Sequence, residues 1–142
     1  TGARLKGYRQ ALREAEIPFQ KEYITYGAYS TASGYERVRH IIEAYPETDA
    51  IFAGADTIAI GVLRALRELN IPVPGQVSVL GFDNIMLSAD LTPALTTVAQ
   101  PIYEMGYRAA RKLLALIGGD PEGAKSECMS TTLVQRESTR SR

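Results

Sequence analysis

VPGQVSVLGFDNIMLSADLTPALTTVAQP, from Val73 to Pro101, is the stretch of sequence that decides the fold. It predicts a turn, a short strand over Val77 to Leu80, a loop that carries an acid–amide pair, and a second extended segment over Thr96 to Ala99. The strand has no polar alternation apart from Ser78, which is typical of a parallel strand that is covered on both faces. The stretch therefore predicts part of an α/β fold.

Apolar strands and amphipathic helices alternate through the rest of the chain, which indicates a parallel sheet flanked by helices on both faces. Ser33 and Glu36 have the spacing of a capping box, and Asp56 is predicted to cap the next helix. The polar tail over Gln135 to Arg142 is expected to fray. The predicted helices and strands are helices over Arg4 to Ala15, Ser33 to about Tyr45, Asp56 to before Asn70 and Ile102 to Ile117, and strands over Tyr23 to Tyr26, Ala50 to Ala53 and Glu127 to Val134.

The composition is that of an ordinary globular chain without a charge bias. Its 142 residues suffice for one domain with a core, and sixteen basic residues balance sixteen acidic ones. A neutral balance argues against this segment gripping nucleic acid by itself, because phosphate binding needs a positive surplus. The single cysteine, Cys128, allows no intrachain disulfide, is expected to be a small core residue, and fits a reducing compartment such as the cytoplasm. No apolar run is long enough to span a membrane.

Four residues are candidates for holding a small polar ligand, because ligands of parallel sheets sit beyond the carboxyl ends of the strands. Asp83 follows a strand in GFDN, where a carboxylate can accept hydrogen bonds from two neighbouring hydroxyls. Asp56 lies at the same end of the sheet but also fits a structural N-cap. Tyr29 can stack on an apolar ligand face or simply lie on the surface. Arg4 can donate two parallel hydrogen bonds to a ligand or be a solvated helix arginine.

No catalytic or metal-binding pattern competes with this interpretation. The only histidine, His40, has no ligand partner at metal-binding spacing and is expected on the surface. The sequence lacks the phosphate-binding loops, the zinc-protease motif and the nucleophile elbow of the hydrolases. Asp56 and Asp83 are conceivable as an acid/base pair, but no nucleophile or metal accompanies them. We therefore expect no enzyme activity, no catalytic residue, no metal and no cofactor.

Eight different motifs, each occurring once, cover essentially the whole chain in one order and spacing. They are RLKGY at Arg4 to Tyr8, SGY at Ser33 to Tyr35, DAIFA at Asp49 to Ala53, ADTIAIG at Ala55 to Gly61, IPVPGQVSVLGFDN at Ile71 to Asn84, LTTVAQP at Leu95 to Pro101, MGYRAA at Met105 to Ala110 and LVQREST at Leu133 to Thr139. Together they resemble the effector-binding core of the lactose-repressor/galactose-repressor (LacI/GalR) family of bacterial transcription regulators. One departure is Ala55, where relatives commonly carry an asparagine, and it argues against a galactoside-like contact at this position.

The resemblance implies that this chain is one part of a larger regulator. Residues 1–142 are expected to form the C-terminal lobe of a periplasmic-binding-protein-like core, including the crossover helix 102–117, whereas the DNA-binding domain and most of the N-terminal lobe lie outside the chain. A sugar or nucleoside effector would close the cleft and change the DNA affinity of the full-length protein. Arg4 and Asp83 would hold polar groups of the effector, Tyr29 would stack on it, and Asp56 would lie in the same cleft. A sugar-binding protein of a transport system is the alternative.

Two further expectations concern association. Regulators of the resembling family are typically dimers, so a homodimer is expected. The helix 102–117 would normally pack partly on the other lobe, and a strand preceding Arg4 would be central in the sheet. The isolated chain is therefore expected to self-associate through the open sheet edge and through one helix face. That face consists of Ile102, Met105, Ala109 and Leu113.

Overall fold

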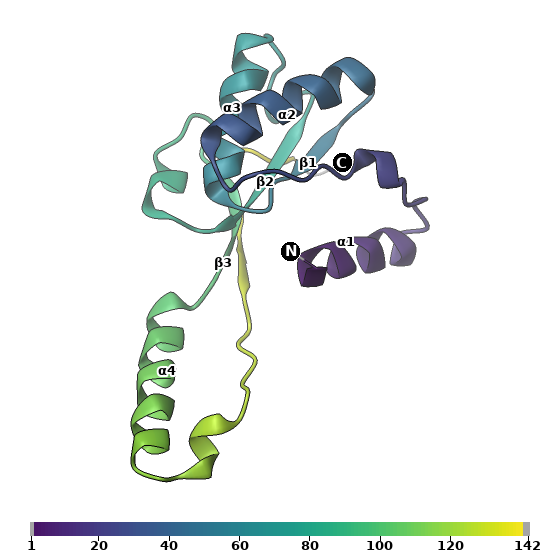
Figure 1. Cartoon of the computed structure of the whole chain (residues 1–142). Coiled ribbons are helices and arrows are strands. Elements are labelled where there is room, and N and C mark those ends of the chain that lie inside the picture. The colour runs from purple at the N-terminus through teal and green to yellow at the C-terminus, as the bar shows by residue number, and fades with distance from the viewer. Residues whose placement is uncertain (1, 141–142) are drawn as a thin grey trace.

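The computed structural model describes residues 2–140, which form a mixed α/β fold around a four-stranded sheet (Figure 1). The strands are β1 (Ala50–Phe52), β2 (Ser78–Asp83), β3 (Thr96–Ala99) and β4 (Thr132–Val134), in that order across the sheet. β1, β2 and β3 run parallel, whereas β4 runs antiparallel to β3. The predicted α/β class is confirmed, with the difference that one edge strand of the otherwise parallel sheet is antiparallel.

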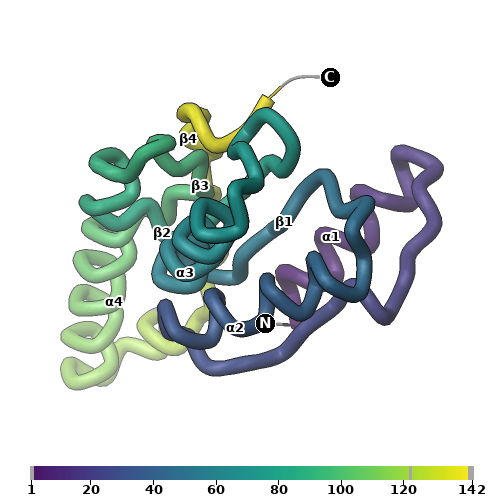
Figure 2. Tube along the Cα trace, turned by 90° about the horizontal axis from the view of Figure 1, so that it is seen from above, coloured from purple at the N-terminus to yellow at the C-terminus, as the bar shows by residue number. Residues whose placement is uncertain are grey.

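Two helices, α2 (Thr31–Ala44) and α3 (Asp56–Glu68), lie side by side (Figure 2), and α3 packs on β2. They approach closely because glycines occupy their contact. A Cβ atom at Gly34 would overlap the carbonyl of Ile58 in α3, and one at Gly61 would overlap the backbone of α2. The absence of side chains at these two positions therefore sets the distance between the helices.

The hydrophobic core lies between α3 and the sheet. On the apolar face of α3, Ala59, Val62, Leu63 and Leu66 are buried, and Leu69, just after the helix, is half-buried. Each fully buried Val or Leu contributes roughly 1.5–3 kcal/mol to folding. The apolar residues of the core that are below 2% exposed are Val38, Ala59, Ala65, Leu66, Val77, Val79 and Leu95.

The two faces of β2 are covered unequally. Val79 and Gly81 point toward α3 and are buried, whereas Leu80 and Phe82 on the opposite face are half-buried. Phe52, the partner of Leu80 in β1, is 39% exposed. Apolar side chains on the face away from α3 are thus partly exposed. One of them, Phe82, contacts a candidate ligand-binding residue described below.

The N-terminal segment departs from the sequence prediction at one point. Helix α1 (Gly2–Glu14) forms as expected, beginning two residues earlier, and a short 3₁₀ helix, η1 (Lys21–Tyr23), follows. The strand predicted over Tyr23 to Tyr26 is wrong. Ile24 is extended, but no strand of the described sheet lies beside it. Residues with a preference for strands form one only where a neighbouring strand supplies hydrogen bonds.

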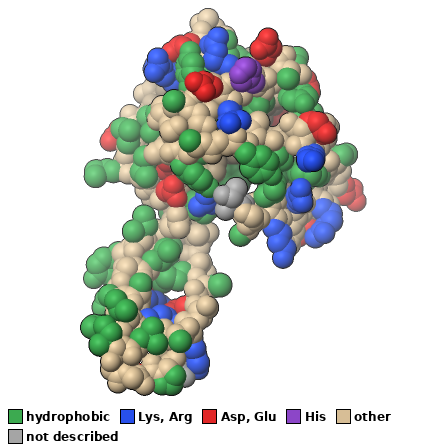
Figure 3. Space-filling model, in the orientation of Figure 1, with side chains coloured by type: hydrophobic (Ala, Val, Ile, Leu, Met, Phe, Trp, Pro, Cys, Tyr) green, Lys and Arg blue, Asp and Glu red, His purple; other side chains and the backbone are tan. Residues whose placement is uncertain are grey.

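Helix α4 (Ile102–Ile117) and the 3₁₀ helix η3 (Pro121–Ala124) form an arm that projects from the body, from which the chain returns to β4 (Figure 1). We call residues 102–124 the arm. The bounds of α4 match the prediction, yet none of its residues is buried. Apolar side chains lie openly on the arm (Figure 3), and the predicted contact face is among them. None of the side chains that the structure describes covers this face.

The helix caps differ from those predicted. Ser30, not Ser33, caps α2, because the Ser30 side chain accepts a hydrogen bond from the Ser33 amide at 3.2 Å. The hydroxyl of Ser33 instead accepts from Arg37 Nε. Ala55 occupies the N-cap position of α3, and Asp56 is the first helical residue. The sequence signals placed both helix starts within three residues but assigned the capping side chain wrongly.

The C-terminal part also corrects two expectations. Of the strand predicted over Glu127 to Val134, only the last three residues form β4, and Cys128 is exposed rather than in the core. The tail does not fray through residue 140. Ser138 is completely buried, where its hydroxyl donates to the carbonyl of Val79 at 2.6 Å and accepts from the amide of Thr96 at 2.8 Å. Hydrogen bonds to two strands therefore fix a polar segment that sequence composition alone marks as mobile.

Candidate functional site

Polar and aromatic side chains gather where β1 and β2 end and α3 begins, the end of a parallel sheet at which ligands bind. Arg4 reaches this place from α1. Its Nη1 donates to the carbonyl of Gly54 at 2.8 Å, and its guanidinium carbon lies 3.9 Å from the centre of the Phe82 ring. The hydroxyl of Tyr29 lies 3.5 Å from the same nitrogen. Two of the four predicted residues are thus brought together, and Phe82 joins them.

Asp83 lies directly after Phe82 and is the last residue of β2, which runs three residues beyond the predicted strand. The Asp83 side chain is half-buried, and its Oδ1 accepts a hydrogen bond from Gln100 Nε2 at 2.7 Å. Gln100 follows β3, whose Ala99 is the register partner of Asp83. The amide of Gln100 thereby orients one carboxylate oxygen and leaves acceptor capacity on this carboxylate for a polar ligand.

The turn after β2 has an unusual backbone. Asp83 has a φ of 117° and Asn84 a φ of 55°, and L residues seldom adopt positive values. Such conformations cost on the order of 1–3 kcal/mol and persist where surrounding contacts hold them. They occur often in ligand-binding turns, which is a second reason to place a site here.

Asp56 is placed differently from the other candidates. It is completely buried, and both carboxylate oxygens accept hydrogen bonds from the protein. Oδ1 accepts from Thr97 Oγ1 at 2.6 Å, and Oδ2 accepts from the Ile85 amide at 2.9 Å. A Cβ atom at Gly81 would overlap this carboxylate, so the glycine makes room for it. Asp56 thus joins α3, β3 and the turn after β2, and its contact with a ligand stays a prediction.

Phe82 and Gln100 were missed as candidates by sequence reasoning. Gln100 had a usable signal, because it directly follows the extended segment predicted over Thr96 to Ala99, at the same sheet end as Asp83. Phe82 had none, because an aromatic residue at a strand end is most simply interpreted as core. Its half-exposed ring becomes a platform only because Arg4 lies on it.

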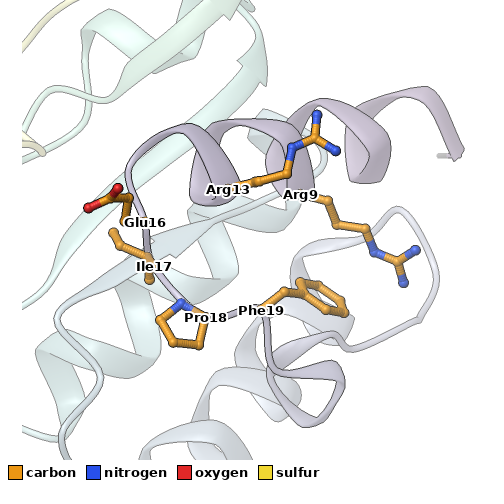
Figure 4. Close-up of a pocket in the computed structure, with 6 residues that line it drawn as sticks. All are labelled: Arg9, Arg13, Glu16, Ile17, Pro18 and Phe19. Carbon is orange, nitrogen blue, oxygen red and sulfur yellow. The ribbon is translucent and has the colours of Figure 1, made fainter.

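Two surface hollows lie apart from these residues. One, of about 670 Å³, is at the far end of α1, where Figure 4 shows Phe19 below the helix with Arg9 reaching past its ring. The Arg9 guanidinium carbon is 4.4 Å from the ring centre. The other, of about 390 Å³, is on the arm. Neither is lined by Arg4, Tyr29, Asp56 or Asp83, and both are shallow and open to solvent, so we do not assign the ligand site to them.

Metal and membrane contacts find no support in the part of the chain that the structure describes. Among residues 2–121 and 123–140, no three His, Cys, Asp or Glu side chains lie close enough to hold a metal ion, and His40 is exposed as expected. No helix in the same range has the length and apolarity needed to cross a membrane.

Comparison with known proteins agrees with this geometry. Residues 1–139 match the family described as periplasmic binding protein-like domain. The transcriptional repressor PurR of Photorhabdus laumondii is 36% identical over 137 residues, which cover 96% of this chain and 40% of the relative. The repressor CytR of Escherichia coli has the same identity and coverage. The solved structure of the transcriptional regulator CelR in complex with cellobiose superposes with a TM-score of 0.86 at 34% identity, covering 95% of this chain and 41% of that one.

The fold and the matching sequence define the class: the chain belongs to the periplasmic-binding-protein-like domain family. Within that family it is of the type found in LacI-family transcription regulators, as the sequence motifs predicted. The chain spans 40% of the length of the PurR and CytR relatives. Both of these relatives are transcriptional repressors.

Proposed function

We propose that this chain is the C-terminal lobe of the effector-sensing core of a LacI-type transcription regulator, and that its effector is a sugar or nucleoside. The observation that carries the proposal is the stacking of Arg4 on Phe82, the residue directly before Asp83, whose carboxylate is oriented by Gln100. A donor, an acceptor and the ring of Tyr29 then lie at one sheet end. This combination suits a ligand with hydroxyl groups on one side and an apolar face on the other.

Each residue has a distinct part in this proposal. The Asp83 carboxylate accepts hydrogen bonds from ligand hydroxyls, and the Arg4 guanidinium donates to ligand oxygens. Tyr29, whose side chain is 56% exposed, stacks on the apolar face of a sugar or base. Asp56 supports the site from the protein interior, because its carboxylate accepts hydrogen bonds from the Ile85 amide and from Thr97 and so fixes the turn and the strand beside the ligand.

In this proposal, regulation depends on a second lobe that forms the other half of the cleft. In the full-length protein the second lobe closes over the ligand, and the ligand shifts the population toward the closed form. Closure changes the geometry of a homodimer and hence the affinity of separate DNA-binding domains for their operator. Met86 is 89% exposed and Leu87 49% exposed in the turn after β2, which supports a protein contact beside the effector site. Such a regulator works in the cytoplasm, with DNA as its partner.

The alternative is a sugar-binding protein of a transport system, which shares the fold. The similarity to PurR, CytR and the catabolite control protein A of Priestia megaterium favours the regulator. Catabolite control protein A is 39% identical over 110 residues.

The test uses the full-length protein, titrated by calorimetry with cellobiose, glucose, ribose, adenosine and cytidine. We expect one of these ligands to bind and to change the retention of the protein's own upstream DNA in a gel-shift experiment. Arg4→Met should abolish the effect of the ligand, whereas Arg9→Met on the same helix should not. Binding of a sugar without any change in DNA retention would favour the transport protein, and a response unaffected by Arg4→Met would place the ligand elsewhere.

A further inference from the structure

Arg136, just after β4, reaches across the sheet to the turn that follows β2. Its Nη2 donates to Asn84 Oδ1 at 2.8 Å. Its Nη1 donates to the carbonyl of Leu95 at 2.8 Å and to Ser88 Oγ at 3.1 Å. One half-buried guanidinium therefore ties together three acceptors from the turn, from the 3₁₀ helix η2 (Met86–Ala89) and from the residue before β3.

The turn that Arg136 holds is the strained one. Asn84 follows Asp83, and both have positive φ values. The Asn84 amide donates to Thr97 Oγ1 at 3.3 Å, and the Ile85 amide donates to Asp56 Oδ2 at 2.9 Å. The backbone amides of the turn are thus bound from β3 and α3. The side chain of Asn84 is bound by Arg136, from the C-terminal segment.

The contacts require an arginine. Three acceptors in different directions are met by two nitrogens of one planar fork, whereas the single ammonium of lysine is a point charge on a flexible stem. Arg136 itself is fixed by the segment around it, because its amide donates to Thr96 Oγ1 at 2.9 Å and nearby Ser138 is buried between two strands. Both the backbone and the guanidinium of Arg136 are therefore fixed by hydrogen bonds, as is required of a residue that sets the position of its neighbours.

We propose that Arg136 is a positioning residue of the effector site, which holds the strained turn through Asn84 and thereby aims the Asp83 carboxylate at the ligand. The part that concerns the ligand rests on the proposed function. The C-terminal segment then belongs to the site without touching the ligand.

The first experiment measures amide hydrogen exchange in the full-length protein and needs no ligand. We compare Arg136→Gln with Arg140→Gln. Arg140 lies in the same C-terminal segment as Arg136, but its side chain donates to the carbonyl of Gly75, away from the turn. Arg136→Gln should speed exchange of the Asn84 and Ile85 amides at least tenfold and leave the Ala59 amide in α3 within twofold. Unchanged turn amides would overturn the proposal. So would equal acceleration of the Ala59 amide, or of the turn amides in Arg140→Gln, because either result means general support of the fold.

The second experiment measures affinity for cellobiose and adenosine by calorimetry. Arg136→Gln should bind the probe at least tenfold more weakly than wild type, and Arg140→Gln within twofold of it. The Asn84→Gly variant tolerates a positive φ but lacks the acceptor for Arg136. When Arg136→Gln is added to this variant, the loss of affinity, on a logarithmic scale, should be less than half of the loss that Arg136→Gln causes in wild type. An unchanged affinity of Arg136→Gln would overturn the link to Asp83. If wild type binds neither probe, the proposed function fails for these ligands, while hydrogen exchange still decides the role of Arg136.

Discussion

Gln100 donates a hydrogen bond from Nε2 to Asp83 Oδ1 at 2.7 Å, between the ends of two adjacent parallel strands. The contact fixes the direction of a carboxylate that would otherwise turn freely about its side-chain bonds. Hydrogen bonds to charged groups contribute about 1.5–3 kcal/mol, roughly one to two powers of ten in an equilibrium constant. The pair thus links strand register directly to the geometry of the proposed effector site.

The first prediction follows from this pair. Gln100→Leu removes the donor while keeping a side chain of similar size, so the Asp83 carboxylate loses its fixed orientation. We expect the full-length protein to bind its effector about tenfold more weakly. Calorimetric titration measures the change, with Gln135→Leu, at an exposed position, as the control. Equal affinity of Gln100→Leu and wild type would show that the orientation of Asp83 does not matter for binding.

The second prediction concerns the buried carboxylate of Asp56. Asp56→Ala leaves the Thr97 hydroxyl and the Ile85 amide without their acceptor. Unsatisfied buried polar groups cost about 1–3 kcal/mol each, so the free energy of unfolding should fall by about 3 kcal/mol. Urea unfolding of the full-length protein tests this. Asp90→Ala, at an exposed position, should change the free energy by less than about 0.5 kcal/mol.

The third prediction compares two helical glycines. Gly61→Ala places a Cβ atom against the backbone of α2 and should destabilise the protein by about 1–3 kcal/mol through overpacking. Gly106→Ala meets nothing within 4 Å and should be neutral or stabilising by up to about 1 kcal/mol. Thermal and urea unfolding of both variants provide the measurement. A stable Gly61→Ala variant would mean that the two helices separate without cost.

The fourth prediction concerns the arm. Ile102 is 63% exposed and Leu113 58% exposed on the same helix face. We expect the isolated chain to self-associate through this face, and Leu113→Glu to reduce the association. Light scattering at increasing protein concentration measures it, with Arg111→Glu as the control at a polar position. A monodisperse monomer of the unmodified chain at high concentration would contradict the prediction.

The fifth prediction concerns pH. Tyr35 donates to Glu68 Oε2 at 2.5 Å, and this hydrogen bond, followed by that from Arg64, lowers the pKa of Glu68 below its ordinary value of 4.5. A lowered folded-state pKa adds stability above pH 4.5, which is lost as the pH falls through the folded-state pKa. Tyr35→Phe should raise the pKa of Glu68, as followed by NMR titration of its side chain. The same pKa in wild type and Tyr35→Phe would remove Tyr35 as the main cause.

Local signals in the sequence predicted several elements well. The bounds of β3 and α4 agree with the prediction residue for residue, since Pro101 precedes α4 and two glycines end it. The sequence also named the sheet end at which the candidate residues were expected, and the structure brings two of them, Arg4 and Tyr29, together there. The prediction of a strand over Tyr23 to Tyr26 was wrong, because residues that favour strands form one only where a neighbouring strand supplies hydrogen bonds.

The sequence by itself determined the α/β class, the family and, apart from the strand wrongly predicted over Tyr23 to Tyr26, the order of helices and strands, because periodicity and motif spacing are local properties of the chain. Only the tertiary structure decided what the polar side chains do. Asp56 has the pattern of a helix cap, yet its buried carboxylate accepts a hydrogen bond from Thr97, 41 residues away. Arg136 lies in a tail that composition marks as loose, yet it binds Asn84 across 52 residues. Such pairings depend on the positions of whole strands, and no local pattern encodes them.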